Sequence, residues 1–113
     1  MEEKKTNELK VYKPQYVYIL LCEDGSYYTG YSTDPNRRFR EHASGKGAKY
    51  TRAHKPTELL YIEKYKTKSE ALKREHQIKQ LTHEQKKQLM LENKQNLLKY
   101  KKIEALKAII FQH

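Results

Sequence analysis

The sequence has only one cysteine and no long apolar run, and both features exclude classes of protein. Cys22 alone cannot form an internal disulfide, and the lack of a second cysteine argues against a zinc site, as does the unpaired spacing of the five histidines. No apolar stretch approaches the ~20 residues of a membrane span, and the first ten residues lack the apolar core of a signal peptide. We therefore expect a reduced, cytoplasmic protein with no membrane partner.

Acidic residues are also scarce: the chain has 14 Asp and Glu against 24 Lys and Arg, for a net charge of +10. A surplus of this size favours a polyanionic partner, most often nucleic acid. The imbalance is sharpest over residues 37–57, where seven basic residues accompany a single acid, Glu41. A solvated surface with no specific partner is the alternative, but it would mix the two signs more evenly. We expect a nucleic acid, DNA first, as the partner.

A chain of 113 residues fits one domain. Alternating runs rich in aromatic and β-branched residues predict strands at residues 16–23, 27–32 and 58–66. Capping and periodicity predict helices at residues 35–44, 67–81 and 82–91, with a loop at residues 45–57. The order β-β-α-β-α-α predicts an α+β fold, with a three-stranded antiparallel sheet flanked by helices.

The two ends of the chain differ from this middle part. Residues 1–14 are charged and patternless, which predicts a flexible leader before a domain at residues 15–91. Residues 92–113 are basic and helix-prone, so we expect a helical tail that is available to a protein partner. A loose apolar stripe runs along this tail through Tyr100, Ile103, Leu106 and Ile110.

The helix boundaries carry specific signals. Asp34 is a good N-cap, Pro35 suits the first helical position and Gly45 is placed to end that helix. Thr67 and Thr82 are each followed three residues later by Glu or Gln, which is the capping-box pattern.

The first two strands bring two tyrosines together only in one hairpin register. A two-residue loop puts Tyr18 and Tyr28 on opposite faces of the sheet, because strand side chains alternate. A three-residue loop puts them on one face, needs a left-handed residue at Gly25, and sets Gly30 opposite Tyr18. The residues alone permit both loops.

The helices add three more candidates. Arg38 and His42 are four residues apart and share one helix face, and the guanidinium of Arg38 suits a phosphate. Glu75 has the same three-residue spacing as Leu72 and Ile78, which puts a carboxylate in an apolar stripe, where it is costly unless it is paired or binds a metal. The alternative is an ordinary exposed pair between Glu75 and Lys79.

In this order, the motifs resemble those of the GIY-YIG nuclease family. The first signature reads Tyr16-Val17-Tyr18 here, and the second reads Tyr28-Thr29-Gly30. The spacing from Arg38 to His42 matches the family's helix motif, and the segment ALKREHQIK matches the one with the metal-binding glutamate, here Glu75. The chain resembles in particular the small, stand-alone bacterial GIY-YIG proteins, relatives of excision-repair and structure-specific nucleases.

The resemblance implies a GIY-YIG fold and a site in which both signature tyrosines flank the scissile phosphate, which favours the three-residue loop. It implies that Glu75 holds one divalent cation, Mg²⁺ or Mn²⁺, and that Arg38 neutralises charge on the phosphorus. Tyr18 or Tyr28 would orient or deprotonate the attacking water, and His42 would assist proton transfer or bind phosphate. In the alternative interpretation, the tyrosines are simple sheet aromatics and Arg38 is a surface residue.

The resulting hypothesis is a metal-dependent DNA endonuclease, structure-specific and linked to DNA repair or recombination. Five further basic residues are expected to contact the phosphate backbone without reading its sequence: Arg37, Arg40, Lys46, Lys49 and Arg52. The alternatives are a non-catalytic nucleic-acid-binding module and an accessory subunit that docks a partner through residues 92–113.

Overall fold

A computed structural model describes residues 13–111. The elements follow the order β1 (Gln15–Cys22), β2 (Tyr27–Ser32), α2 (Pro35–Ala43), α3 (Lys49–Ala53), β3 (Pro56–Tyr65), α4 (Lys68–Lys79), α5 (His83–Glu92) and α6 (Lys94–Phe111). The three strands form one antiparallel sheet in the order β2-β1-β3, so β1 is central. The predicted α+β fold with a three-stranded antiparallel sheet is confirmed.

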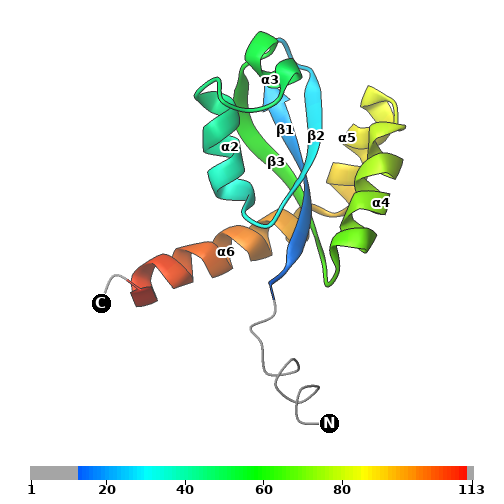
Figure 1. Cartoon of the computed structure of the whole chain (residues 1–113). Coiled ribbons are helices and arrows are strands. Elements are labelled where there is room, and N and C mark those ends of the chain that lie inside the picture. Colours follow the sequence, from blue (N-terminus) through cyan, green and yellow to red (C-terminus); the bar gives the residue numbers. More distant parts are fainter. Residues whose placement is uncertain (1–12, 112–113) are drawn as a thin grey trace.

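The sheet separates two apolar layers. Even-numbered side chains of β1 pack with Phe39 of α2 and Tyr100 of α6, whereas Val17 and Ile19 face the layer formed with α4 and α5. Figure 1 shows this division, with α2 on one side of the sheet and α4 and α5 on the other. Period-two alternation in β1 therefore assigns each side chain to a layer.

The β1–β2 hairpin has the three-residue loop. The backbone N–H of Cys22 donates to the Ser26 carbonyl at 2.9 Å, and the N–H of Gly25 donates to the Cys22 carbonyl at 2.9 Å. Gly25 adopts a φ of +83°, which only glycine takes without strain. Gly30 lies opposite Tyr18, and a Cβ atom there would overlap the Tyr18 ring. The hairpin prediction is confirmed.

The predicted caps at the helix ends are also present. Asp34 accepts a hydrogen bond from the N–H of Arg37, and Gly45, just beyond the end of α2, has a φ of +84°. Thr67 forms a capping box before α4, and Thr82 forms one before α5. Each cap contributes about 1 kcal/mol by satisfying backbone donors that the helix leaves open.

The loop prediction for residues 45–57 is wrong in two places. Lys49–Ala53 form the short helix α3, and β3 begins at Pro56, before the expected start at residue 58. The N-terminus of α3 has no side-chain cap. Its Thr51 is buried and bonded to α2, so a tertiary contact that local sequence does not reveal holds this turn.

The apolar face of α4 also differs from the expected one. Leu72 is 40% exposed, whereas Ala71 and Ile78 are fully buried. Ala71 precedes Glu75 by four residues and Ile78 follows it by three, so the buried stripe passes through Glu75, as expected, but not through Leu72.

The C-terminal helix α6 packs on the sheet at one point and then extends away from it (Figure 1). Tyr100 belongs to the core layer, lies 5.4 Å from the Tyr16 ring, and accepts a hydrogen bond from the N–H of Asn36 at 3.2 Å. The later members of the predicted stripe, Ile103, Leu106 and Ile110, are exposed. Most of the expected leader lies outside the described residues. Among residues 13–111, no helix is long and apolar enough to cross a bilayer.

Candidate active site

Tyr18 lies at the centre of the candidate site. Its side chain is only 1% exposed, and its hydroxyl is 2.8 Å from Nε2 of His42. The hairpin register brings the Tyr28 ring to 6.4 Å from the Tyr18 ring and 5.0 Å from that of His42. Burial is the main cause of a strongly raised pKa at Tyr18; the charges of Tyr28 and Glu75 raise it further and Arg38 lowers it.

His42 links this tyrosine to α3. It is 1% exposed, and its Nδ1 lies 2.7 Å from Oγ1 of Thr51, which donates to the Ala48 carbonyl at 3.0 Å. Because the hydroxyl proton of Thr51 goes to that carbonyl, this pattern favours a proton on Nδ1 and an Nε2 that accepts from Tyr18. The opposite tautomer needs a 3.4 Å bond from the Ala48 N–H, which is long for a hydrogen bond.

The electrostatic state of His42 follows from its surroundings. Burial, aided by the nearby charge of Arg38, lowers its pKa to about 4, although Glu41 opposes the shift. The imidazole is therefore neutral at pH 7 and offers a lone pair to the Tyr18 proton.

Two residues that the sequence reasoning missed shape this end of the site. A Cβ atom on Gly47 would overlap the His42 ring, so the loop can approach the imidazole only through a glycine. Tyr50, 39% exposed, stacks on Tyr28 with ring centroids 6.0 Å apart and on His54 at 4.2 Å. The only sequence signal was their position in the basic segment GKGAKYT, which gave no indication of contact with His42.

Arg38 lies beside the tyrosine and the histidine. Its Nη1 donates to Oε1 of Glu41 at 3.0 Å, and its side chain is 35% exposed. Its charge lowers the pKa of both Tyr18 and His42, which places the guanidinium near both groups. Arg38 is thus held by one carboxylate while it remains open to solvent.

Glu75 lies on α4, which packs on the other face of the sheet from Tyr18. Its carboxylate is half-buried, with 18% of the side chain exposed, and Oε2 lies 3.4 Å from Nζ of Lys79. Partial burial and the expected i,i+4 pair therefore coexist. The link between Glu75 and the site is electrostatic, because its charge raises the pKa of Tyr18.

The donors near this point fit a sparsely liganded cation. Among residues 13–111, no group of three His, Cys, Asp or Glu side chains could hold a metal ion. A single carboxylate such as Glu75 still suits Mg²⁺ or Mn²⁺, because Mg²⁺ usually keeps several waters and takes few protein ligands beside a phosphate. Zinc, which takes three or four protein ligands, does not fit this donor set.

The five expected backbone-contact residues are exposed and lie on α2, on α3 or in the loop between them: Arg37, Arg40, Lys46, Lys49 and Arg52. Arg37 also lies 4.0 Å from Glu41. The elements that bear these five residues also supply His42 and Thr51, so the basic surface adjoins the buried end of the site.

The larger part of the chain matches a known protein family. The family model described as the GIY-YIG catalytic domain matches residues 14–88. The chain belongs to the GIY-YIG family. Its three-stranded antiparallel sheet with flanking helices is the GIY-YIG fold. All five candidate catalytic residues lie within the matched part of this GIY-YIG chain.

Relatives of this GIY-YIG chain occur in Staphylococcus epidermidis and in Haloquadratum walsbyi. The chain is 56% identical over 77 residues to the "UPF0213 protein SERP0126" of Staphylococcus epidermidis, covering 68% of this chain and 94% of the relative. It is 57% identical over 74 residues to the "UPF0213 protein HQ_3675A" of Haloquadratum walsbyi, covering 66% and 83%. The solution NMR structure of the UPF0213 protein BH0048 from Bacillus halodurans is 49% identical, covers 71% and 85%, and has a TM-score of 0.47.

Proposed function

We propose that this GIY-YIG chain is a metal-dependent endonuclease that hydrolyses phosphodiester bonds in DNA. The observation that supports this most directly is the 2.8 Å contact between the Tyr18 hydroxyl and Nε2 of the neutral His42. A buried tyrosine with a raised pKa is a poor base by itself. A hydrogen-bonded imidazole supplies the missing acceptor for its proton.

The proton transfers in this proposal involve three groups of the chain. The Tyr18 oxygen takes a proton from the attacking water while its own proton passes to Nε2 of His42. Nδ1 of His42 keeps its proton, which Thr51 Oγ1 accepts in a hydrogen bond. The water oxygen forms the new bond to phosphorus, and the leaving oxygen departs with the electrons of the broken bond. His42 thus gains one positive charge as the phosphate gains negative charge.

Arg38 would stabilise that negative charge. Its guanidinium is fixed on one side by Glu41 at 3.0 Å and keeps other N–H donors for phosphate oxygens. Donors that are fixed in place before the reaction stabilise developing charge without reorganising at that moment. The partly buried hydroxyl of Tyr28 would bind the same phosphate from the β2 side.

Glu75 would hold the divalent cation, Mg²⁺ or Mn²⁺, which when bound polarises a phosphate oxygen and stabilises the leaving oxygen. For this, the Glu75 carboxylate must give up its 3.4 Å pair with Lys79. Because the Lys79 side chain is 48% exposed, its ammonium can return to solvent when the pair opens.

The basic surface on α2 and α3 would hold the DNA backbone. Contacts to phosphate provide affinity and register, and their strength falls with salt. Because such contacts do not read sequence, we propose that the enzyme selects DNA by structure, in repair or recombination. The single buried thiol of Cys22 agrees with our expectation of a cytoplasmic location.

A second candidate is a non-catalytic nucleic-acid-binding module. The ion pairs Arg38–Glu41 and Glu75–Lys79 favour it, because they account for both charged side chains without a substrate or a metal. This candidate predicts DNA binding in the presence of chelator and no cleavage under any condition.

The test is cleavage of labelled flap, branched, duplex and single-stranded DNA in Mg²⁺, in Mn²⁺ and in chelator. Glu75→Ala is the test variant, and Glu84→Ala, an exposed acid in the first turn of α5, is the matched control. We expect cleavage by the parent and by Glu84→Ala, and none by Glu75→Ala or in chelator. Equal cleavage by both variants would refute the proposed role of Glu75, and binding without any cleavage would establish the second candidate.

A further inference from the structure

One cavity in the described part of the chain lies away from the candidate active site. Its volume is about 850 Å³, and it lies between β3, α4 and α6. None of the candidate catalytic residues lines it. Its size falls in the range of small-molecule sites. One wall is formed by α6, which begins at Lys94. The match to the catalytic domain ends earlier, at residue 88. This cavity therefore depends on a helix that is additional to the family domain.

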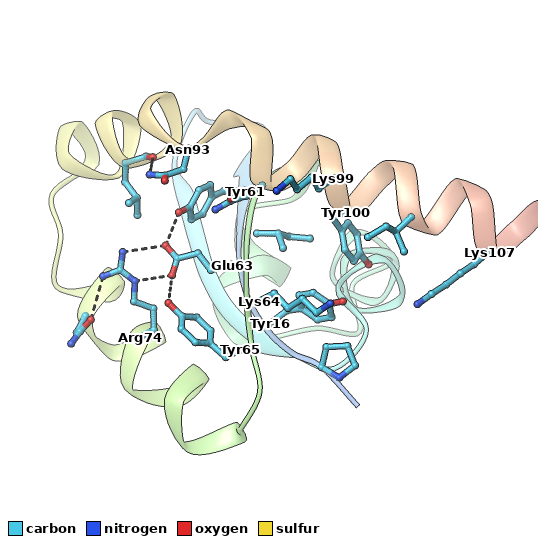
Figure 2. Close-up of a pocket in the computed structure, with 16 residues that line it drawn as sticks. Tyr16, Tyr61, Glu63, Lys64, Tyr65, Arg74, Asn93, Lys99, Tyr100 and Lys107 are labelled. Carbon is cyan, nitrogen blue, oxygen red and sulfur yellow. Dashed lines mark hydrogen bonds and ion pairs between the residues drawn. The ribbon is translucent and has the colours of Figure 1, made fainter. Parts of the chain in front are cut away.

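A hydrogen-bonded polar cluster lines the cavity (Figure 2). The carboxylate of Glu63 accepts hydrogen bonds from Arg74 at 2.7 and 3.1 Å, from Tyr61 at 2.5 Å and from Tyr65 at 2.7 Å. Burial opposes ionisation of Glu63, but these donors hold its pKa below the ordinary value. Both carboxylate oxygens are thus engaged, and the negative charge of Glu63 is neutralised by its own partners.

Positive charge dominates the rest of the wall. Lys64, Lys99 and Lys107 line the cavity together with Arg74, against Glu63 as the single acid among the lining residues. Lys64 and Lys99 are exposed, whereas Lys107 has a weak pair with Glu104 at 3.7 Å. The electrostatic environment therefore favours an anionic ligand.

Aromatic rings and amide groups complete the lining. The Tyr65 ring is fixed by its hydroxyl bond to Glu63, and Tyr16 and Tyr100 form a second aromatic surface with ring centroids 5.4 Å apart. Asn93 and Asn96 add amide donors and acceptors on the α6 side. Lysines beside tyrosine faces form the combination that binds phosphate and base together.

We propose that this cavity, which curves around the edge strand β3, binds a nucleotide, with the base against Tyr65 on one face of the strand and the phosphate at Lys64 and Lys99 on the other. The nucleotide has two chemical sources: a free mononucleotide, or an unpaired nucleotide at the end of a nucleic-acid strand. The site is separate from the cleavage chemistry, so it stands or falls independently of the endonuclease function. Ile62 also lines the cavity, and it pairs with Tyr18 between β3 and β1. The cavity and the candidate active site therefore meet at paired positions of neighbouring strands.

The test is an amide NMR titration of the full 113-residue chain. The small probes are the four nucleoside monophosphates, adenosine, ribose 5-phosphate and inorganic phosphate. The larger probes are DNA with a single-stranded overhang, blunt duplex DNA and an acidic peptide. We expect at least one mononucleotide, or DNA with a single-stranded overhang, to shift the signals of residues 63–65 and 96–103 saturably. Ribose 5-phosphate and adenosine should each bind about tenfold more weakly than the intact nucleotide, because each lacks one of the two contacts.

Five variants complete the design. Lys99→Ala and Tyr65→Leu should each weaken binding about tenfold, while Tyr65→Phe, which keeps the ring, should retain most of it. Lys101→Ala is the control, because this exposed lysine is on the same helix but does not line the cavity. Glu75→Ala should bind the nucleotide as the parent does, whether or not it cleaves DNA.

Comparison of mononucleotide binding with overhang-DNA binding also distinguishes the source of the nucleotide. Tighter binding of the mononucleotide identifies a free ligand, and tighter binding of overhang DNA than of blunt duplex identifies a strand end. The proposal is overturned if neither shifts the cavity signals, if inorganic phosphate or an acidic peptide binds as well as the nucleotide, or if Lys101→Ala loses as much affinity as Lys99→Ala.

Discussion

The hydroxyl of Tyr18, on the central strand, lies 2.8 Å from Nε2 of His42, on α2. Both side chains are 1% exposed, and burial strengthens this bond relative to one at the surface. The bond gives a buried tyrosine a partner that can take its proton, and it connects the sheet to the loop that follows α2 through Thr51.

Arg38 provides the first prediction, because its proposed role depends on the shape of the guanidinium as well as on its charge. Arg38→Lys keeps the charge but loses the planar set of N–H donors. We expect both Arg38→Lys and Arg38→Ala to lower the single-turnover rate of DNA cleavage about 100-fold, the range seen for a lost donor to developing charge. DNA affinity, measured in parallel, should change much less. Recovery of the parental rate by the lysine variant would contradict this role.

The stability of the protein should depend on the protonation of His42. Its pKa of about 4 in the folded state lies below the ordinary value of about 6.5, so the unfolded state binds more protons between these two pH values. The stabilisation is complete above pH 6.5 and is lost as the pH falls toward 4, with a loss of about 2 to 3 kcal/mol.

Urea unfolding of the parent and of His42→Gln at pH 7, 5.5 and 4.5 measures this dependence. We expect the free energy of unfolding to fall more steeply with decreasing pH in the parent than in the variant, which cannot titrate at this position. Parallel curves for the two proteins would show that His42 titrates near its ordinary pKa.

Gly47 should not tolerate a side chain. A methyl group there overlaps the His42 ring, so Gly47→Ala should lower the free energy of unfolding by about 1 to 3 kcal/mol and displace the imidazole. Gly25→Ala is a useful comparison, because its Cβ atom would meet nothing within 4 Å and only its positive φ is strained. NMR signals of the His42 ring should shift in the first variant and stay in place in the second.

The attachment of α6 leads to a prediction about the extent of the domain. Tyr100 is 6% exposed and packs in the core layer, so Tyr100→Ala should lower the free energy of unfolding by about 3 kcal/mol or more. Ile103→Ala, on the exposed side, should change it by less than about 0.5 kcal/mol. Equal, small effects would mean that residues 92–113 form a separate tail, as the sequence suggests.

Local chemistry explains which parts of this fold could be predicted. The hairpin follows from the positive φ at Gly25, and the starts of α4 and α5 follow from capping boxes, because each signal involves residues within three positions of one another. The proximity of Tyr18 and Tyr28 then follows from strand alternation.

The remaining features depend on contacts between distant segments. The helix α3 has no side-chain cap and is held by Thr51 against His42, nine residues earlier in the chain. The charge of Glu75 on α4 raises the pKa of Tyr18, a relation that helix periodicity alone does not indicate. Spacing also wrongly placed Leu72 in the buried stripe, because spacing shows which residues share a helix face but not which face meets the sheet.

The most direct test of the central claim is the single-turnover rate of DNA cleavage by Tyr18→Phe, with binding measured on the same preparation. Tyr31→Phe, which removes a hydroxyl on the other face of the sheet, is the control. The proposed proton transfer predicts a rate at least about 100-fold below the parent for Tyr18→Phe, unchanged DNA affinity, and a parental rate for Tyr31→Phe. Cleavage at the parental rate by Tyr18→Phe would contradict the account, because the proton would then leave the water by a path that does not include this hydroxyl.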